Sequence, residues 1–358
     1  MSLDIKTQEQ LNTDMLGNIS DDYEKSTGFL TADLVKTYSI ELSKVYLAIE
    51  KIMEKFDVDL LSGDELEKFI NQRKGISRKQ ATYAKVALTI TGNNAGINIG
   101  DVFSTAGNIQ FQSLDTKLIN GTNTITAQCT QSGSIGMVGA NSITLMPITI
   151  AGVTNITNLQ PSYDGFDAES DNDLRNRYYE ALRTPITSAN KYHYLQWAKS
   201  VTGVGNAKVI PLWNGANTVK VIIIDANMQP ASGEIVTQVQ SYIDPAINGL
   251  GDGQAPIGAF CTVVSATGKA IDISVDVEIA DGYSLDDVKQ NFETKLREYL
   301  KSIAFSETVK YVSLAKIGQL IMETDGVLDY QNLLVNAGTA NITIGDNEVG
   351  IVGTITIS

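Results

Sequence analysis

The chain has 358 residues, with 27 Lys and Arg against 41 Asp and Glu, and therefore a net charge of −14. This acidic balance argues against the phosphate backbone of nucleic acids and against anionic membranes as partners. The length predicts about two or three domains, and no apolar run approaches the ~18 to 20 residues of a membrane-spanning helix.

Residues 1–30 are polar and begin MSLDIKTQEQ, which lacks the basic and then apolar order of a secretory signal. We therefore expect the chain to remain in the cytosol in which it is made. The composition of this segment predicts an arm that becomes ordered on a neighbour, if at all.

Residues 31–82 predict a helical segment dominated by one long amphipathic helix, which Thr31 can cap. Apolar side chains recur at alternating steps of three and four over three heptads, as in helices that pair along a seam. The seam comprises Val35, Tyr38, Leu42, Val45, Ile49, Ile52 and Phe56. The helix either packs within its own domain or bundles with other chains. Only one short predicted helix, near residues 64–72, offers a partner nearby, which favours a bundle.

The rest of the chain predicts three further domains. Residues 83–162 are rich in Thr, Ile, Val, Asn and Gly, with turn residues about every ten positions, as in a small all-β sandwich or barrel. Residues 163–268 and 269–358 mix helices and strands, which predicts two α+β units. Aligning residues 203–204 with 326–327, both Gly-Val, suggests a weak internal repeat. The predicted fold class is therefore α+β and multidomain.

An acidic run, YDGFDAESDNDLRNRYYEALRTP at residues 163–185, raises the question of a metal site. A calcium loop counted from Asp167 would need Gly at its sixth place and a bidentate acid at its twelfth. Those places hold Asn172 and Tyr178, which excludes this kind of site.

The same run satisfies the rules for the start of a helix. Ser170 and Asp173 form a capping box, and Asp171 lies beside Asp173 at the positive end of the helix dipole. Leu174 begins the apolar face, and Pro185 is expected to prevent continuation past the preceding residue.

No catalytic or cofactor motif is found in the sequence. The single histidine, His193, has no nucleophile motif beside it, and Cys129 and Cys261 are too far apart for a zinc knuckle and predict buried, reduced thiols. No phosphate-binding or dinucleotide-binding glycine loop is complete. The sequence therefore predicts a protein without enzymatic activity, metal or cofactor, although carboxylate pairs of a hydrolase are not readable from sequence.

The order of several stretches resembles the baseplate J-like family, the wedge proteins of contractile phage tails and tail-derived bacteriocins. These stretches are MLGNISDDYEKSTGFL, the heptad helix, LEKFINQRKGISRKQAT, SGSIGMVGANSIT, ITIAGVTNITN and GFDAESDNDLRNRYYEAL. The most specific motif comprises Gly165, Asp167, Ala168, Glu169, Ser170, Asp171, Leu174, Arg175 and Arg177. A second motif comprises Gly75 and Arg78, whereas the Gly-Asn pair frequent near Gly136 is replaced here by Gly-Ala-Asn at residues 139–141.

The resemblance implies a structural role rather than catalysis. Two copies would join a smaller tail protein through their N-terminal helices, and six such wedges would close into a ring around the tube and hub. A lysozyme-like wedge protein would connect the ring to the sheath, and the finished particle would leave the cell. The resemblance also leads us to expect that Arg175 and Arg177 anchor to nearby carboxylates or carbonyls. The alternative is a carbohydrate-binding tail adhesin built on the β-rich region.

Overall fold

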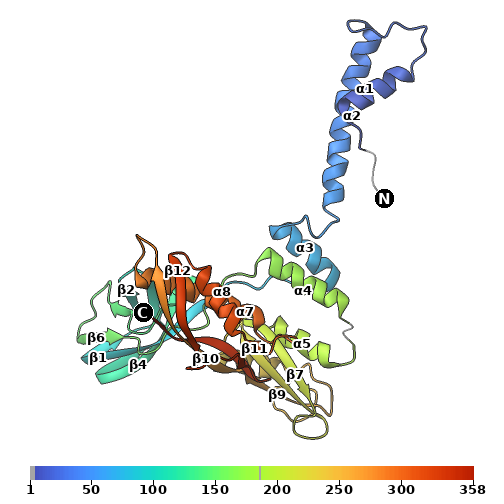
Figure 1. Ribbon diagram of the computed structural model, residues 1–358. Helices are drawn as coiled ribbons and strands as arrows, with labels where there is room; N and C mark the ends of the chain where they lie inside the picture. Colours follow the sequence, from blue (N-terminus) through green and yellow to red (C-terminus); the bar gives the residue numbers. More distant parts are fainter. Residues whose placement is uncertain (1–4, 185–186) are drawn as a thin grey trace. The chain divides into compact units, whose positions relative to one another are not determined.

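The computed structural model describes residues 5–184 and 187–358, and the chain divides into two compact units. The first unit combines Met1–Arg78 with Ser170–Leu182, and the second combines Lys79–Glu169 with Arg183–Ser358. Figure 1 colours the first unit blue, apart from the green helix α4. No helix within the described residues is long and apolar enough to cross a membrane.

The long helix α2, Leu30–Glu54, is preceded by a shorter helix, α1, at Gln8–Gly17, which packs against it. Leu11 of α1 is buried, and the Gln8 side-chain amide donates to the buried Ser39 hydroxyl of α2 at 3.0 Å. Part of the segment expected to be an unordered arm is therefore folded onto its own chain.

The predicted cap of the long helix is wrong by two residues. The N-cap is Phe29, which makes no side-chain hydrogen bond, whereas Thr31 already lies inside the helix. The apolar pattern thus predicted the helix, while its first residue is not marked by a capping side chain.

Helices α3, Gly63–Lys74, and α4, Asp171–Arg183, form a small core of their own. Its buried members are Val58, Leu61, Leu66, Ile70, Ile76, Leu174 and Tyr178. Gly75 ends α3 in the left-handed conformation, with φ 66°, which glycine adopts without strain. The predicted domain boundaries place α4 with residues 163–268, but its apolar face packs against α3 instead. Pro185, expected to stop α4, lies outside the described residues.

The second unit begins with a six-stranded antiparallel sheet of order β5-β2-β3-β4-β1-β6, which curls into a nearly closed barrel. The strands are β1 Tyr83–Ile97, β2 Val102–Thr105, β3 Gln110–Ser113, β4 Lys117–Ser132, β5 Ile143–Leu145 and β6 Val153–Thr157. Along β1, Ala84, Val86, Leu88 and Ile90 alternate into the buried interior, as expected for a strand with one covered face. This confirms the predicted all-β region.

Within the second unit, the central α+β domain has a three-stranded sheet of order β7-β8-β9. Its elements are α5 Lys191–Ser200, β7 Val204–Pro211, β8 Thr218–Asp225, α6 Gly233–Ile243 and β9 Phe260–Ser265. His193 stacks on Trp197, with 4.1 Å between ring centroids, and its Nδ1 accepts the N–H of Ala189 at 3.2 Å. Burial lowers the pKa of His193, which favours the neutral form of the ring. Both cysteines are free and buried.

The C-terminal α+β domain of the second unit has a three-stranded sheet of order β12-β10-β14. Its elements are β10 Thr267–Ile279, α7 Leu285–Ile303, β11 Tyr311–Val312, α8 Leu314–Met322, β12 Val327–Val335, β13 Ile342–Thr343 and β14 Glu348–Ile357. Gly203 before β7 and Gly326 before β12 have nearly the same φ, 90° and 91°. However, β7 pairs directly with β8, whereas β10 lies between β12 and β14. The repeat is therefore limited to a helix, a glycine and one strand.

Contacts inside the second unit tie its three parts together. Phe166, at the end of the barrel, is buried in the core of the central part. Between the central and C-terminal parts, the Asp346 carboxylate accepts from the ammonium groups of Lys208 at 2.6 Å and Lys310 at 3.0 Å. These lysines lower the pKa of Asp346 to about 2, so the contact persists over the whole neutral range.

Candidate functional site

The predicted seam of α2 is largely uncovered. Val35 is buried and Ile49 is partly buried, but the other seam side chains are exposed: Tyr38, Leu42, Val45, Ile52 and Phe56. Phe56, predicted as the last residue of the seam helix, lies instead in the turn that follows the end of α2 at Glu54. Tyr38 and Phe56 expose 65% and 70% of their surface. Leu34 and Met53, which widen the stripe, are exposed as well. A contiguous apolar surface of this kind typically marks a contact with another protein.

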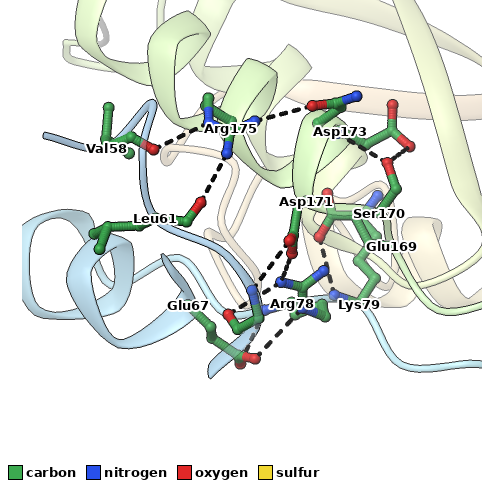
Figure 2. Close-up of polar contacts among 12 residues, drawn as sticks. Val58, Leu61, Glu67, Arg78, Lys79, Glu169, Ser170, Asp171, Asp173 and Arg175 are labelled. Atoms are coloured by element: carbon green, nitrogen blue, oxygen red, sulfur yellow. Dashed lines mark hydrogen bonds and ion pairs between the residues drawn. The ribbon is translucent and has the colours of Figure 1, made fainter. Parts of the chain in front are cut away.

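A second candidate site is the cluster of charged side chains between α3 and α4, shown in Figure 2. At the first residue of α4, the Asp171 carboxylate accepts the backbone N–H of Gly63 at 3.0 Å and forms an ion pair with Arg78. These contacts lower the pKa of Asp171, the Gly63 hydrogen bond most strongly. One carboxylate therefore joins the start of α4, the start of α3 and the loop after α3.

The Arg78 side chain is the centre of this cluster. Its guanidinium also donates to the carbonyl of Gly63 at 3.3 Å and lies 3.7 Å from a carboxylate oxygen of Glu67. The backbone N–H of Arg78 donates to Glu67 at 3.1 Å. Only 15% of the Arg78 side chain is exposed, so these contacts lie in a partly dehydrated environment where charge pairing is stronger.

The two arginines of the acidic motif bind backbone carbonyls of the same unit. Arg175 donates from Nε to the carbonyl of Val58 at 3.0 Å and from Nη2 to that of Leu61 at 2.9 Å (Figure 2). Arg177 donates to the carbonyl of Ser77 at 2.6 Å. The geometry thus fastens α4 to both ends of the α3 segment.

The remaining carboxylates of the motif also have backbone or hydroxyl partners. The Ser170 hydroxyl accepts the N–H of Asp173 at 3.1 Å and donates to its carboxylate at 2.6 Å. In the second unit, the Asp167 carboxylate accepts the N–H and the hydroxyl of Ser134, both at 2.8 Å, and these bonds lower the pKa of Asp167. Glu169 accepts the N–H of Lys79 at 3.0 Å.

Within residues 5–184 and 187–358, no group of three or more His, Cys, Asp or Glu side chains is placed to hold a metal ion. The carboxylates point instead at N–H groups, a hydroxyl and a guanidinium. Sequence reasoning missed that Arg78 meets Asp171, because 93 residues separate them and neither local pattern records the pairing.

Gly165 of the motif is required by close packing inside the barrel unit. A Cβ at this position would lie 2.8 Å from the Cβ of Ala84 and 3.0 Å from the carbonyl oxygen of Gly133. Gly165→Ala is therefore expected to destabilise the second unit by about 1 to 3 kcal/mol in urea unfolding, because the backbone must shift to admit a methyl group.

The matched control for this change is Gly139→Ala. A Cβ at Gly139 would have no heavy atom within 4 Å, so stability is expected to change by no more than about 0.5 kcal/mol. Equal effects of the two substitutions would show that crowding does not explain the glycine at position 165.

Three family models match the chain: the Baseplate J-like protein barrel domain at residues 87–165, the Baseplate J-like central domain at 186–265 and the Baseplate J-like protein C-terminal domain at 271–358. The chain belongs to the Baseplate J-like family. The barrel model covers the region for which the sequence alone left a carbohydrate-binding adhesin as the alternative.

Two relatives of this Baseplate J-like chain match it over almost its full length, and a third matches about half of it. Two proteins of Bacillus subtilis (strain 168), the uncharacterized protein YqbT and the phage-like element PBSX protein XkdT, are each 34% identical over 353 residues, 98% of this chain and 97% of theirs. Baseplate protein gp47 of Escherichia phage Mu is 32% identical over 207 residues, 55% of this chain and 57% of its own.

A chain of the anti-feeding prophage (AFP) baseplate, in its 6-fold symmetrised cryo-EM structure, is similar with a TM-score of 0.38 and 9% identity. The similarity covers 96% of this chain and 90% of that one. The family match, together with the relatives from PBSX and phage Mu, places the chain among phage and prophage baseplate proteins.

Proposed function

We propose that this Baseplate J-like protein is a structural wedge component of a contractile injection system, either a phage tail or a bacteriocin-like particle, and has no enzymatic activity. Its N-terminal helices join a second copy and a smaller tail protein, and six such wedges surround the tube. The observation that carries the proposal is the exposed seam of α2, because the described part of its own chain leaves most of these apolar side chains in water.

The free energy gained by burying the apolar seam side chains supports a permanent contact between the chains. Burying each large seam side chain contributes roughly 1.5 to 3 kcal/mol before entropy is counted. The exposed seam residues from Leu42 to Phe56 expose 39% to 70% of their surface, so their burial, added to that of the partner's side chains, offsets much of the cost of association. Helix α1 packs against the first half of α2, where Gln8 bonds to Ser39. We therefore place the partner helices along the second half of α2, from Leu42 to Ile52, and against Phe56 in the turn that follows.

The remaining domains take different roles in this proposal. Residues 1–30 and 31–82 form the bundle, and the cluster around Arg78, Asp171 and Arg175 holds α4 on the bundle segment. The barrel at 83–162 and the α+β domains at 163–268 and 269–358 contact neighbouring wedges, the tube and hub, and a lysozyme-like protein linked to the sheath. The protein assembles in the bacterial cytoplasm and leaves the cell in the particle.

The proposal is tested by co-expressing the full chain with the products of neighbouring reading frames and measuring masses by light scattering. We expect a stable complex of two copies of this chain with one smaller protein. A chain that remains monomeric beside every neighbouring product would contradict the proposed assembly, whatever the state of the C-terminal domains.

A further inference from the structure

A second exposed apolar surface lies at one end of the central sheet, far from α2 in the sequence. It is formed by the β7–β8 turn and by the loop that leads into β9, and we call it the apolar tip. Its members are Leu212, Trp213, Leu250, Ile257 and Phe260. Ile257 exposes 84% of its surface, and Leu212 and Leu250 expose 67% and 66%.

The two loops of the apolar tip are held together by backbone contacts. The N–H of Phe260 donates to the carbonyl of Asn217 at 2.9 Å, and the pairing of Thr218 with Phe260 brings both loops to the same end of the sheet (Figure 1). Inside the second loop, the N–H of Gly258 donates to the carbonyl of Gly249 at 2.8 Å. Loops held by such internal bonds lose little conformational entropy when they bind a partner.

The apolar tip is poor in charge, although the chain carries a net charge of −14. Residues 211–219 contain no charged side chain, and residues 245–260 contain only Asp252. At the border, the Lys220 ammonium lies 4.0 Å from the ring centroid of Trp213. Neither Asp252 nor Lys220 has an ion-pair partner among the described residues.

We propose that the apolar tip binds the same surface of a second copy of this chain, in a two-fold contact. Two copies with this charge repel one another over most of their surfaces, so self-association is favoured where charge is scarce and apolar side chains are exposed. In a two-fold contact, residue i of one copy meets residue j of the other and the reverse. One cation and one carboxylate on the same patch then form two equivalent ion pairs, Lys220 with Asp252 of the other copy.

This inference rests on the proposed function, because it assumes that copies of the chain are neighbours in a ring. It identifies one surface through which such neighbours touch. It is separate from the α2 seam, because the apolar tip belongs to the central domain of the second unit. Disrupting the seam and disrupting the tip therefore have different expected effects.

The test is a charge exchange in the full chain, with self-association measured by sedimentation over a concentration series. It is run in the Ile49→Asp background, which removes contacts through the α2 seam. We expect a concentration-dependent dimer from this parent chain. Lys220→Glu and Asp252→Lys are each expected to weaken the dimer by roughly tenfold or more, because both symmetric contacts then oppose like charges.

A mixture of the two single variants tests whether the contact is two-fold. In the mixed pair, both contacts again join opposite charges, so the heterodimer is expected to recover the parent affinity to within about threefold. Ile257→Asp is expected to abolish association, because it places a carboxylate in the apolar contact. Ser302→Asp, on the exposed surface of α7, adds the same charge elsewhere and is expected to leave the dimer unchanged.

Three outcomes would overturn the proposal. The first is a parent chain that stays monomeric at every concentration. The second is a mixture of the single variants that associates no better than either variant alone. The third is a parent monomer that instead binds neutral phosphatidylcholine vesicles through Ile257, which would make the tip a lipid contact. A normal wedge with a failed tip dimer would leave the proposed function standing.

Discussion

Ile49→Asp is expected to abolish the complex with the second copy and the smaller tail protein while leaving the single chain folded. Ile49 lies in the middle of the seam and is partly exposed, so a carboxylate there remains hydrated in the free chain. In the bundle the same carboxylate would be buried without a partner, which costs several kcal/mol in addition to the lost burial of the isoleucine. Light scattering on the co-expressed proteins measures the loss.

Lys51→Asp provides a demanding control for that change. Two residues further along the helix turn the side chain by about 200°, to the face opposite Ile49. Lys51 is exposed, and the substitution changes the charge by more than Ile49→Asp does. We expect Lys51→Asp to leave the complex intact. A normal complex from the Ile49→Asp chain, or an equal loss from both variants, would contradict the role of the seam.

Arg175→Lys is expected to loosen α4 from α3 although the charge is retained. The guanidinium reaches the carbonyls of Val58 and Leu61 from two different nitrogens, a geometry that a single ammonium does not reproduce. Leaving a carbonyl unsatisfied costs about 1 to 3 kcal/mol. Hydrogen exchange of the α4 amides should therefore accelerate by roughly five- to a hundredfold.

The matched control is Arg297→Lys on α7, where the arginine pairs with Glu293 on the surface at 2.7 Å and 47% of its side chain is exposed. Exposed pairs of this kind contribute at most about 1 kcal/mol, and a lysine can replace the arginine. Exchange in α7 should hardly change. Unaltered exchange of α4 in the Arg175→Lys chain would show that the carbonyl contacts do not hold this helix.

The features that could be predicted from the sequence are those that depend on residues close together in the chain. The seam follows a regular spacing that needs no other part of the chain, and the start of α4 is marked by Ser170 and Asp173 within one turn. The β-rich composition of residues 83–162 likewise reflects the alternation of individual strands, because inward-facing residues are apolar on each strand separately. The long helix, the start of α4 and the all-β region agree with the structure, whereas Phe56 lies beyond the end of α2 and the seam as an interface stays a prediction.

The features that were missed depend on partners distant in the chain. Helix α1 was interpreted as part of an arm because it has few apolar residues, of which only Leu11 is buried, and its place is fixed by contact with α2. The strand order of the barrel depends on which strands pair as the barrel closes, and the sequence of a single strand does not specify its partners. The pairing of Arg78 with Asp171 has the same cause: the two residues come together only when α4 packs on α3.

The discontinuity of the first unit determines the order in which it folds during synthesis. Helix α3 leaves the ribosome about 100 residues before α4, which at ~5 to 20 residues per second corresponds to roughly 5 to 20 seconds. During that interval Leu66 and Ile70 lack the Leu174 and Tyr178 side chains that bury them in the finished chain. The barrel strands, which end at Thr157, emerge before this core closes. A nascent chain stalled before residue 171 would therefore expose the α3 half of that core to chaperones and proteases.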